Sequence, residues 1–188
     1  LTEHFGNASS KQHAYGWAAD AGVEKARKQI ADLLGGTPQE VFFTSGGTES
    51  NTTVLRGVWE SFKDQGCHFI TTQVEHKSIL ESLAFLETQG ALVTYLPVDR
   101  TGKITSEQVE KALTPQTRLV SVIYGNNEIG TINPVNEIAE LCHRHDVLFH
   151  TDAVQAIGRV EVATLKADLI SVSAHKIYGP KGVGALFI

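Results

Sequence analysis

The stretch that decides the fold is Ser171–Ile188, with the sequence SVSAHKIYGPKGVGALFI. Together with the two residues before it, its start predicts a buried strand, Leu169–Ser173, which runs directly into a histidine and a lysine. Gly182–Ile188 is apolar again, after a loop too short for a parallel crossover, so this last run has to pair antiparallel. We therefore expect a sheet in which one strand runs against its neighbours.

Lys176 stands where this buried strand ends, which is an unusual place for a lysine. In one interpretation its stem packs on the sheet while the ammonium group reaches water. In the other, the amine is held in a partly dry pocket, where it can form a Schiff base with an aldehyde cofactor. The residue by itself leaves both interpretations open.

Short β-branched or aromatic runs alternate with helical segments along the rest of the chain. The expected strands are Val41–Thr44, His68–Thr72, Leu92–Val98, Arg118–Tyr124 and Val147–Asp152. The expected helices are Trp17–Gly36, Glu49–Gln65, Lys77–Gln89, Ser106–Leu113 and Val135–His145. Apolar strands that alternate with helices predict an α/β fold with a mainly parallel, doubly wound sheet and one antiparallel strand. On the first helix we expect one packed side, formed by Val23, Ala26, Ile30, Leu33 and Leu34.

Composition excludes several classes of protein. The chain has 188 residues and a net charge of −5, which argues against a nucleic-acid-binding surface. No apolar run approaches ~20 residues, so we expect no membrane span, and the start lacks the features of a signal peptide. The two cysteines, Cys67 and Cys142, suggest reduced thiols, and we expect a cytoplasmic location. The chain starts at Leu1 and has no methionine, so we expect a piece of a longer or processed protein.

Polar residues follow the predicted strands at the points where each strand ends. Ligands of such sheets bind outside the carboxyl ends of the strands, so these segments are expected to surround one pocket. They are Ser45–Glu49, Glu75–His76, Gly125–Glu128, Asp152 with Gln155, and His175–Lys176.

The segment SGGTES, Ser45–Ser50, has glycines that let the backbone approach an anion and Thr48 at a helix start, where N–H groups favour a phosphate. A plain turn with an N-cap explains the same residues. GNNEIG lacks the lysine of a Walker loop and no G-x-G-x-x-G occurs, which disfavours ATP and NAD.

Asp152 follows an apolar strand and is expected to be partly buried, so it needs a cationic or hydrogen-bonding partner. A protonated pyridine nitrogen would suit it, and a role as the cap of a following helix is the alternative. His76 is either a core or helix-start histidine or a ring lying over an aromatic cofactor.

A zinc site is the other possibility that we considered, formed by Cys142, His143, His145 and His150. Cys142 and His145 are three residues apart on a helix, but no second pair of ligands occurs elsewhere. We therefore expect no metal, and solvated histidines at the end of that helix.

The segments TSGGTESN, EHKSIL, NNEIGT, DAVQAIG and SAHKIYGPKGVGALFI occur in the order and spacing of the class V aminotransferase group. The sequence resembles cysteine desulfurases of that group, of the housekeeping type that supplies iron–sulfur cluster assembly. The resemblance runs from FGNASSKQH to the end of the chain.

The resemblance implies the large domain of a type I pyridoxal 5′-phosphate (PLP) fold. By position, Lys176 matches the lysine that binds the cofactor covalently, and His76 the histidine stacked on its ring. Asp152 matches the partner of the ring nitrogen, and Gln155 the residue bonded to the ring hydroxyl.

The remaining matched positions concern the phosphate and the substrate. Thr48, Ser173 and His175 match phosphate ligands, with the backbone of Gly47 nearby, and Asn127 sits where an asparagine approaches cofactor and substrate.

In the family reaction, the lysine takes the α-proton of L-cysteine and the histidine assists. A separate cysteine thiolate then takes the sulfur as a persulfide and leaves alanine. The implied partners are L-cysteine, a second copy in a homodimer and a sulfur-accepting scaffold protein.

The nucleophilic cysteine and a carboxylate-binding arginine of the family lie in a small C-terminal domain, beyond Ile188. The resemblance also implies that the family's N-terminal segment is missing from residues 1–188. Residues 1–188 are therefore expected to form the PLP-binding large domain, inactive alone, with neither Cys67 nor Cys142 as nucleophile. The alternatives are another class V enzyme, such as a selenocysteine lyase or an aminotransferase, and a non-catalytic scaffold of the same fold.

Overall fold

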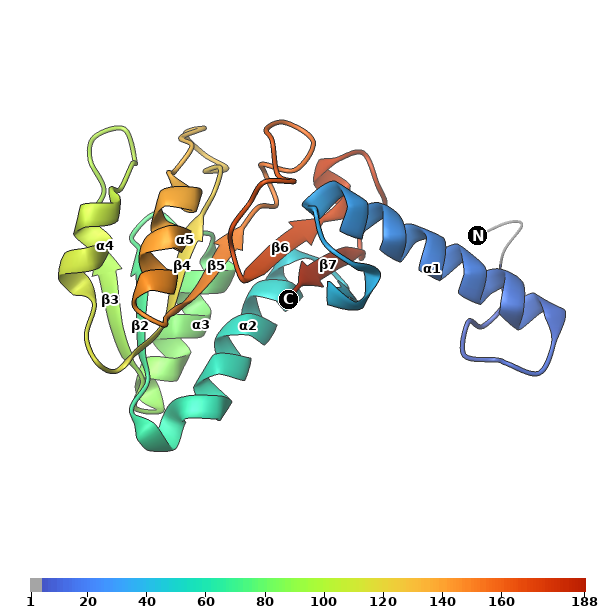
Figure 1. The fold of residues 1–188 in the computed structure, drawn as a ribbon, viewed down its shortest axis with the longest axis horizontal. Helices are drawn as coiled ribbons and strands as arrows, with labels where there is room; N and C mark the ends of the chain where they lie inside the picture. The colour runs from blue at the N-terminus through green and yellow to red at the C-terminus, as the bar shows by residue number, and fades with distance from the viewer. Residues whose placement is uncertain (1–4) are drawn as a thin grey trace.

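A seven-stranded sheet forms the centre of the computed structural model, which describes residues 5–188 (Figure 1). The strands lie in the order β1-β7-β6-β5-β4-β2-β3. Their bounds are β1 Val41–Thr44, β2 His68–Thr72, β3 Leu92–Leu96, β4 Thr117–Ile123, β5 Leu148–Asp152, β6 Leu169–Ser173 and β7 Gly184–Phe187. All neighbouring pairs are parallel except those of β7, which runs antiparallel to both β1 and β6. The prediction of a mainly parallel sheet with one reversed strand is confirmed.

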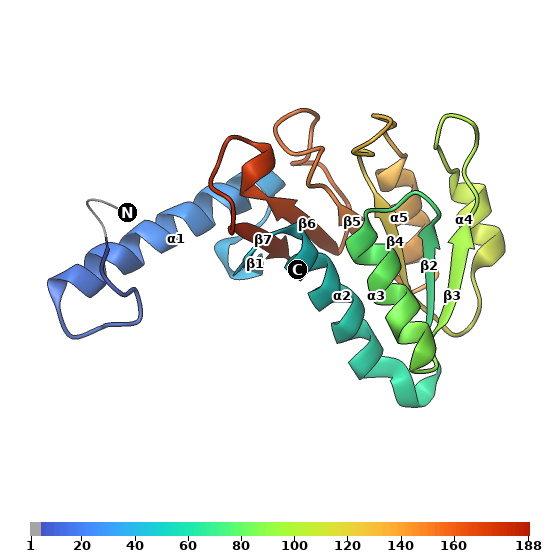
Figure 2. The same cartoon turned by 180° about the vertical axis from the view of Figure 1, so that it is seen from behind.

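Helices cover both faces of the sheet. They are α1 Ala14–Leu34, α2 Gly47–Phe62, α3 Lys77–Thr88, α4 Ser106–Ala112 and α5 Val135–Arg144, with short 3₁₀ turns at Pro38–Glu40, Lys63–Gln65 and Ala174–Lys176. Figure 1 shows α4 and α5 in front of the sheet, and Figure 2 shows α2 and α3 on the opposite face. This is the doubly wound arrangement that the sequence predicts.

Each face of the sheet has its own apolar core. Phe149 of β5 and Ile138 of α5 belong to the core on the α4 and α5 side, and Leu55 and Leu83 belong to the core under α2 and α3. The central strands are buried on both sides, since every residue of β2 and β6 is buried. Their sequences, HFITT and LISVS, still place polar side chains at buried positions, and these are hydrogen-bonded, as His68 is to Thr117 and Ser171 is to His150.

The packed side expected for α1 is partly wrong. Val23 and Leu33 are 37 % and 40 % exposed, whereas Ala31 and Leu34 are buried. The physical reason is visible in Figure 1, where the N-terminal part of α1 projects beyond the sheet and only its last turns contact the rest of the fold. The helix ends as predicted at the glycine pair, with Gly35 at a φ of 79° that glycine tolerates well.

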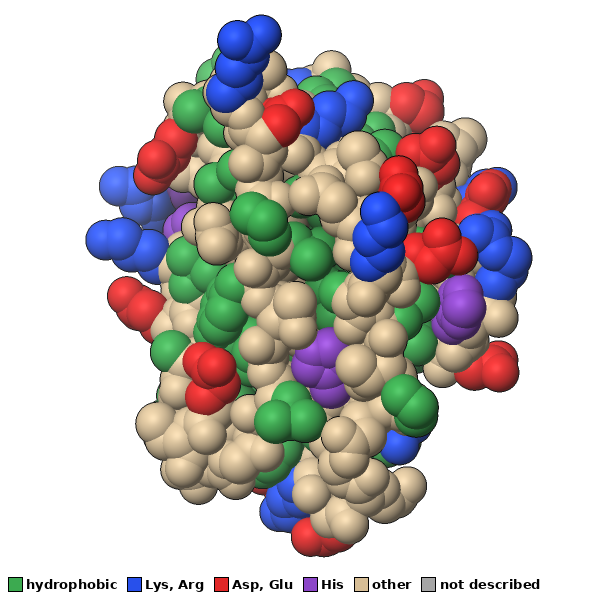
Figure 3. Space-filling model, turned by 90° about the vertical axis from the view of Figure 1, so that its left-hand side faces the viewer, with side chains coloured by type: hydrophobic (Ala, Val, Ile, Leu, Met, Phe, Trp, Pro, Cys, Tyr) green, Lys and Arg blue, Asp and Glu red, His purple; other side chains and the backbone are tan. Residues whose placement is uncertain are grey.

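β3 is an edge strand, and its Leu92 is 52 % exposed. Figure 3 looks at the α4 and β3 side of the molecule and shows apolar side chains across the middle of this face, with charged side chains mostly around its rim. In the part of the chain that the structure describes, no helix combines the length and the apolar character needed to cross a membrane.

The reversed strand β7 brings two glycines into contact next to the predicted pocket. A Cβ atom at Gly184 would lie 2.6 Å from Gly46 Cα and 2.8 Å from the Val172 carbonyl oxygen. Both distances are shorter than any real carbon contact, so β7 reaches this position only because residue 184 has no side chain. Gly46 in turn caps the helix α2 that enters the site.

We predict that Gly184→Ala lowers the free energy of unfolding by about 1–3 kcal/mol, because the methyl group overpacks backbone that cannot move aside. Urea denaturation followed by circular dichroism measures the change. Gly57→Ala is the matched control, since Gly57 lies exposed on α2 with no atom near its Cβ position. That change should raise stability by about 0.5–1 kcal/mol. Equal stability of the Gly184 variant and the wild type would contradict the proposed crowding.

Candidate functional site

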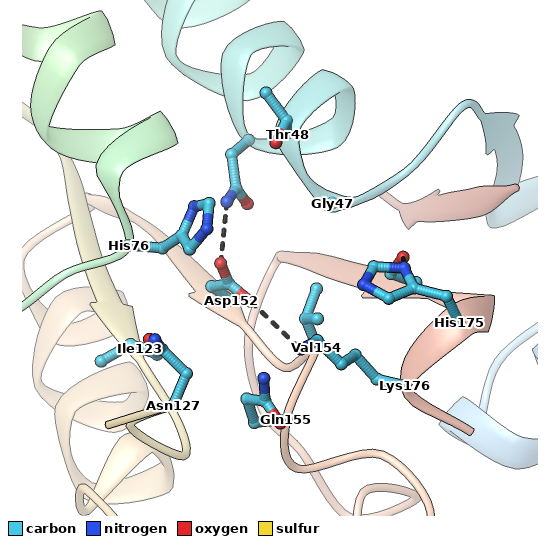
Figure 4. A pocket seen from close by; sticks show the side chains of 12 residues that line it. Gly47, Thr48, His76, Ile123, Asn127, Asp152, Val154, Gln155, His175 and Lys176 are labelled. Carbon is cyan, nitrogen blue, oxygen red and sulfur yellow. Dashed lines mark hydrogen bonds between the residues drawn. The ribbon is translucent and has the colours of Figure 1, made fainter. Parts of the chain in front are cut away.

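A cavity of about 180 Å³ opens where the parallel strands end (Figure 4). It is lined by all nine residues that were matched by position to cofactor or substrate: Gly47, Thr48, His76, Asn127, Asp152, Gln155, Ser173, His175 and Lys176. Of the wider segments expected around the pocket, Ser45, Gly46, Glu49, Glu75, Gly125, Asn126 and Glu128 do not line it. The predicted convergence of strand ends on one pocket therefore holds, while the role of each residue stays a prediction. Sequence analysis missed Asn51, Ile123 and Val154, which line the same cavity.

One end of the cavity is formed by the N-terminus of α2. Gly46 is its N-cap, and no side chain makes a capping hydrogen bond there. A Cβ atom at Gly47 would lie 2.6 Å from Val154 Cγ2, so the helix start packs tightly against the loop after β5. Ser173 Oγ and His175 Nδ1 are hydrogen-bonded at 2.8 Å and line the same cavity. Free N–H groups, a hydroxyl and an imidazole make this end suitable for an anion.

Asp152 ends β5 and is only 4 % exposed, so the expected burial is correct. Its Oδ2 accepts a hydrogen bond from Asn51 Nδ2 at 2.8 Å, and its Oδ1 accepts one from the backbone N–H of Val154 at 3.0 Å. Burial raises the pKa of Asp152, and these two hydrogen bonds oppose the rise. No helix lies between β5 and β6, so the carboxylate caps a turn and not a helix.

His76 is the N-cap of α3, which is the helix-start position considered from the sequence. Its Nδ1 accepts the backbone N–H of Ser78 at 3.2 Å and lies 2.8 Å from Ser78 Oγ. Figure 4 shows the ring beside Asp152, at the wall of the cavity. A helix-start role and a place over a ligand are therefore compatible for this histidine.

Lys176 lies in the 3₁₀ turn Ala174–Lys176 that follows β6. Its side chain is part of the cavity wall and extends toward Val154 in Figure 4. Within residues 5–188, no carboxylate forms an ion pair with its ammonium group. Of the two interpretations left open by the sequence, the placement favours an amine held in a pocket.

The loop that carries Asn127 is fixed by its neighbour, Asn126. The Asn126 side chain donates to the Val74 carbonyl at 2.9 Å and accepts from the backbone N–H groups of Glu128 and Ile129 at 2.9 and 3.1 Å. It thereby ties the loop after β4 to the loop that carries His76. No pattern in the sequence indicates this contact, because the partners of Asn126 are backbone groups whose positions depend on the fold.

Glu75 is a buried carboxylate next to His76, and it is only 6 % exposed. Its Oε1 accepts from Thr72 Oγ1 at 2.7 Å and from the backbone N–H of Ile123 at 3.0 Å. Its Oε2 has no hydrogen-bond partner in the described part of the chain. Burial raises the pKa of Glu75 to about 8, with the charge of Asp152 adding to the rise.

Both cysteines are free and buried. Burial raises the pKa of Cys67 to about 11 and that of Cys142 to about 12. Because the thiolate is the reactive form, neither thiol is suited to nucleophilic chemistry near neutral pH.

The residues considered for zinc are not assembled into a site. Cys142 is buried in the core, and His143 pairs with Asp168 at 3.1 Å. His150 is not solvated but fully buried, with its ring nitrogens 2.8 and 2.9 Å from Ser121 Oγ and Ser171 Oγ. Over residues 5–188 no group of three or more His, Cys, Asp and Glu side chains is arranged to hold a metal ion.

Fold and site together define a class of α/β protein. A lysine amine, a buried aspartate and the N-terminus of a helix surround one small-molecule cavity at the carboxyl edge of a mainly parallel sheet. The lining comes from strand ends, from the start of α2 and from the connecting loops, and the sheet holds these segments close together.

The chain belongs to the class V aminotransferase family, which it matches over residues 1–188. It is 50 % identical over 190 residues to a human protein named cysteine desulfurase, and 51 % identical over 190 residues to a Drosophila melanogaster protein named cysteine desulfurase, mitochondrial. Both comparisons cover all of this chain, which spans only 42 % and 41 % of the length of those relatives.

A solved structure described as SspA in complex with cysteine matches with a TM-score of 0.95 at 39 % identity, over 100 % of this chain and 55 % of that one. Together with the family match, this likeness confirms the resemblance to desulfurases of the class V group and the type I fold that it implies.

The expectation of a cytoplasmic location is wrong. It rested only on composition and on the lack of a recognisable leader. The fly relative and others from Dictyostelium discoideum and Eremothecium gossypii are named mitochondrial, and one from Trachipleistophora hominis is named mitosomal.

We predict that Glu75 makes the stability of the protein fall as the pH rises toward 8. Its pKa in the folded protein, about 8, lies above its ordinary value of 4.5. Because Glu75 holds its proton more tightly in the folded protein than in the unfolded one, its contribution to the stability of the protein is fully present below about pH 4.5. This contribution is lost as the pH rises through about 8. Glu75→Gln should remove this dependence, worth about 2–4 kcal/mol between pH 5 and 8.

Urea unfolding at several pH values measures this effect. Glu81→Gln on the exposed side of α3 is the control, and it should unfold with the pH dependence of the wild type. If Glu75→Gln kept the wild-type pH dependence, Glu75 would be ionised in the folded protein.

Proposed function

We propose that this chain is the PLP-binding large domain of a cysteine desulfurase, which converts L-cysteine to L-alanine and passes the sulfur to an enzyme cysteine as a persulfide for iron–sulfur cluster assembly. The observation that carries the proposal is the meeting of Lys176, Asp152 and the α2 N-terminus at one cavity. The family membership and the desulfurases among the relatives support it.

The charges around the cavity fit PLP. The buried Asp152 has a raised pKa, and each of its oxygens accepts one hydrogen bond, so a protonated ring nitrogen would supply the missing cationic partner. At the α2 end, the start of the helix has no side-chain cap and faces Ser173 and His175, which suits a phosphate. Lys176 provides a primary amine in the same cavity.

In this proposal Gly47, Thr48, Ser173 and His175 hold the phosphate. Asp152 and Gln155 hold the ring nitrogen and the ring hydroxyl, His76 covers the ring, and Asn127 faces cofactor and substrate. When bound, PLP supplies an aldehyde that condenses with amines and a ring that accepts electrons from the substrate α-carbon.

The side chains of the chain itself then manage protons. The Nζ of Lys176, as a free amine, accepts the proton from the α-carbon of cysteine. Asp152 keeps the proton on the ring nitrogen by a charge-assisted hydrogen bond. His76, at the cavity wall, assists proton transfer.

The sulfur acceptor is proposed to lie outside residues 1–188. Cys67 and Cys142 are buried, with pKa values raised to about 11 and about 12, so neither offers a thiolate to the substrate. The share of the relatives that this chain spans, 42 % for the human protein, leaves room for such a residue elsewhere.

A homodimer and a sulfur-accepting scaffold protein are part of the same proposal. The exposed aromatic residues of α1, Tyr15 at 74 % and Trp17 at 58 %, are compatible with a second copy of the chain. The family resemblance is what supports the scaffold partner.

We predict that PLP attaches to Lys176. Full-length protein is incubated with PLP, reduced with borohydride and digested, and the pyridoxyl group should be found on the peptide that contains Lys176. Lys176→Ala should lose the label and slow sulfide release by about 10²–10⁴-fold, the range of general acid–base catalysis. Lys181→Ala, an exposed lysine in the same segment, is the control. An equally strong label on another lysine would refute the assignment.

We predict that Asp152→Asn lowers cysteine turnover by about 10- to 100-fold, since the charge-assisted bond to the ring nitrogen is worth about 1.5–3 kcal/mol. PLP attachment to Lys176 should persist. Alanine and sulfide are measured together, with exposed Asp32→Asn as the control. Unchanged turnover would refute the pairing. Activity on selenocysteine alone would point to a selenocysteine lyase. Failure to bind PLP would point to a non-catalytic scaffold of the same fold.

A further inference from the structure

We propose that Asn51 and Ser78 are positioning residues, which link Asp152 to His76 by a chain of hydrogen bonds of fixed direction and so hold the proton of His76 on Nε2. The inference rests on the proposed function, because it gives His76 a defined task beside the cofactor. Neither residue was predicted from the sequence.

The donor–acceptor direction of these hydrogen bonds follows from a backbone group. The N–H of Ser78 donates to His76 Nδ1 at 3.2 Å, which caps α3. A backbone N–H can only donate, so Nδ1 carries no proton in this arrangement. The neutral imidazole therefore has its proton on Nε2.

The hydroxyl of Ser78 reinforces this tautomer. Ser78 Oγ lies 2.8 Å from the same Nδ1, and because that nitrogen bears no proton, the hydroxyl has to donate. The oxygen is then free to accept, and Asn51 Nδ2 donates to it at 2.9 Å. The bond at 2.8 Å is the shorter of the two that Nδ1 receives.

The Asn51 amide connects Ser78 to Asp152 and so completes the series of hydrogen bonds. Its second N–H donates to Asp152 Oδ2 at 2.8 Å. Both partners of Asn51 accept, which fixes the amide with its nitrogen on this side and its Oδ1 turned away, where Oδ1 has no partner among the described residues. Asn51 and Ser78 are 1 % and 7 % exposed, so water competes little for these bonds.

The consequence for chemistry is that His76 presents an N–H donor, and not a base, on the nitrogen that remains free. Protonation at Nδ1 would break the cap of α3 and the bond from Ser78. His76 therefore acts first as a hydrogen-bond or proton donor from Nε2, and removal of the α-proton is left to Lys176.

The test uses ¹⁵N NMR of the full-length protein with labelled histidine, first free of PLP and then loaded, with His76→Gln to assign the signal. The wild type should show only the Nε2–H form. Ser78→Ala leaves Nδ1 with only the longer of its two bonds, the one from the backbone N–H at 3.2 Å, so a fraction of the Nδ1–H form should appear beside the Nε2–H form. Ser78→Thr, which keeps a hydroxyl, should restore the single form. Ser82→Ala is the matched control, because it removes a different hydroxyl contact between α3 and α2, that with Thr52.

Asn51→Asp provides a second, isosteric variant. A carboxylate at this position accepts the Ser78 hydroxyl and repels Asp152, so the hydroxyl leaves His76 and the mixture of tautomers should appear again. An Nδ1–H form in the wild type, or a pure Nε2–H form in both variants, would overturn the inference. A merely structural role would lower stability without moving the tautomer signal.

The spectra of the PLP-free protein do not depend on the proposed desulfurase activity. The tautomer of His76 and the desulfurase activity can therefore be refuted independently of each other. If the protein is a desulfurase, Ser78→Ala should also slow sulfide release by about 10-fold, a fraction of the 10²–10⁴-fold that acid–base catalysis supplies. Unchanged sulfide release beside a mixed tautomer would overturn the task given to His76.

Discussion

A carboxylate buried at the end of a central strand is the constraint on which the site depends. Asp152 is held in β5 by sheet pairing on both sides, with Ile123 of β4 and Ser171 of β6 as its register partners. Within residues 5–188 it forms no ion pair, and burial raises its pKa. The site is thereby prepared for a ligand that brings positive charge.

The sheet beneath this carboxylate is polar on one face. His150 lies two residues before Asp152 and bridges Ser121 of β4 and Ser171 of β6. Burial lowers the pKa of His150 to about 3, so the ring stays neutral and joins three strands without adding charge. Rigid strands and charge-free packing under the cavity let Asp152 keep its position without its own counter-ion.

The fold was largely predictable, because strand and helix periods, glycine stops and a short last loop are local signals. The buried face of α1 was not, since Val23 and Leu33 have the right period but the helix extends beyond the sheet that would cover them. The cytoplasmic expectation failed for a different reason: composition carries little information about the compartment in which a protein works.

The sequence by itself determined the α/β class, the reversed strand and the residues that gather at the strand ends, because each depends on spacing along the chain. Only the tertiary structure decided which groups join those residues. Asn51 and Ser78 lie in different helices, and Asn126 and Glu75 act through backbone groups of distant segments. Hydrogen bonds of this kind depend on distance and direction in space, which no local pattern in the sequence records.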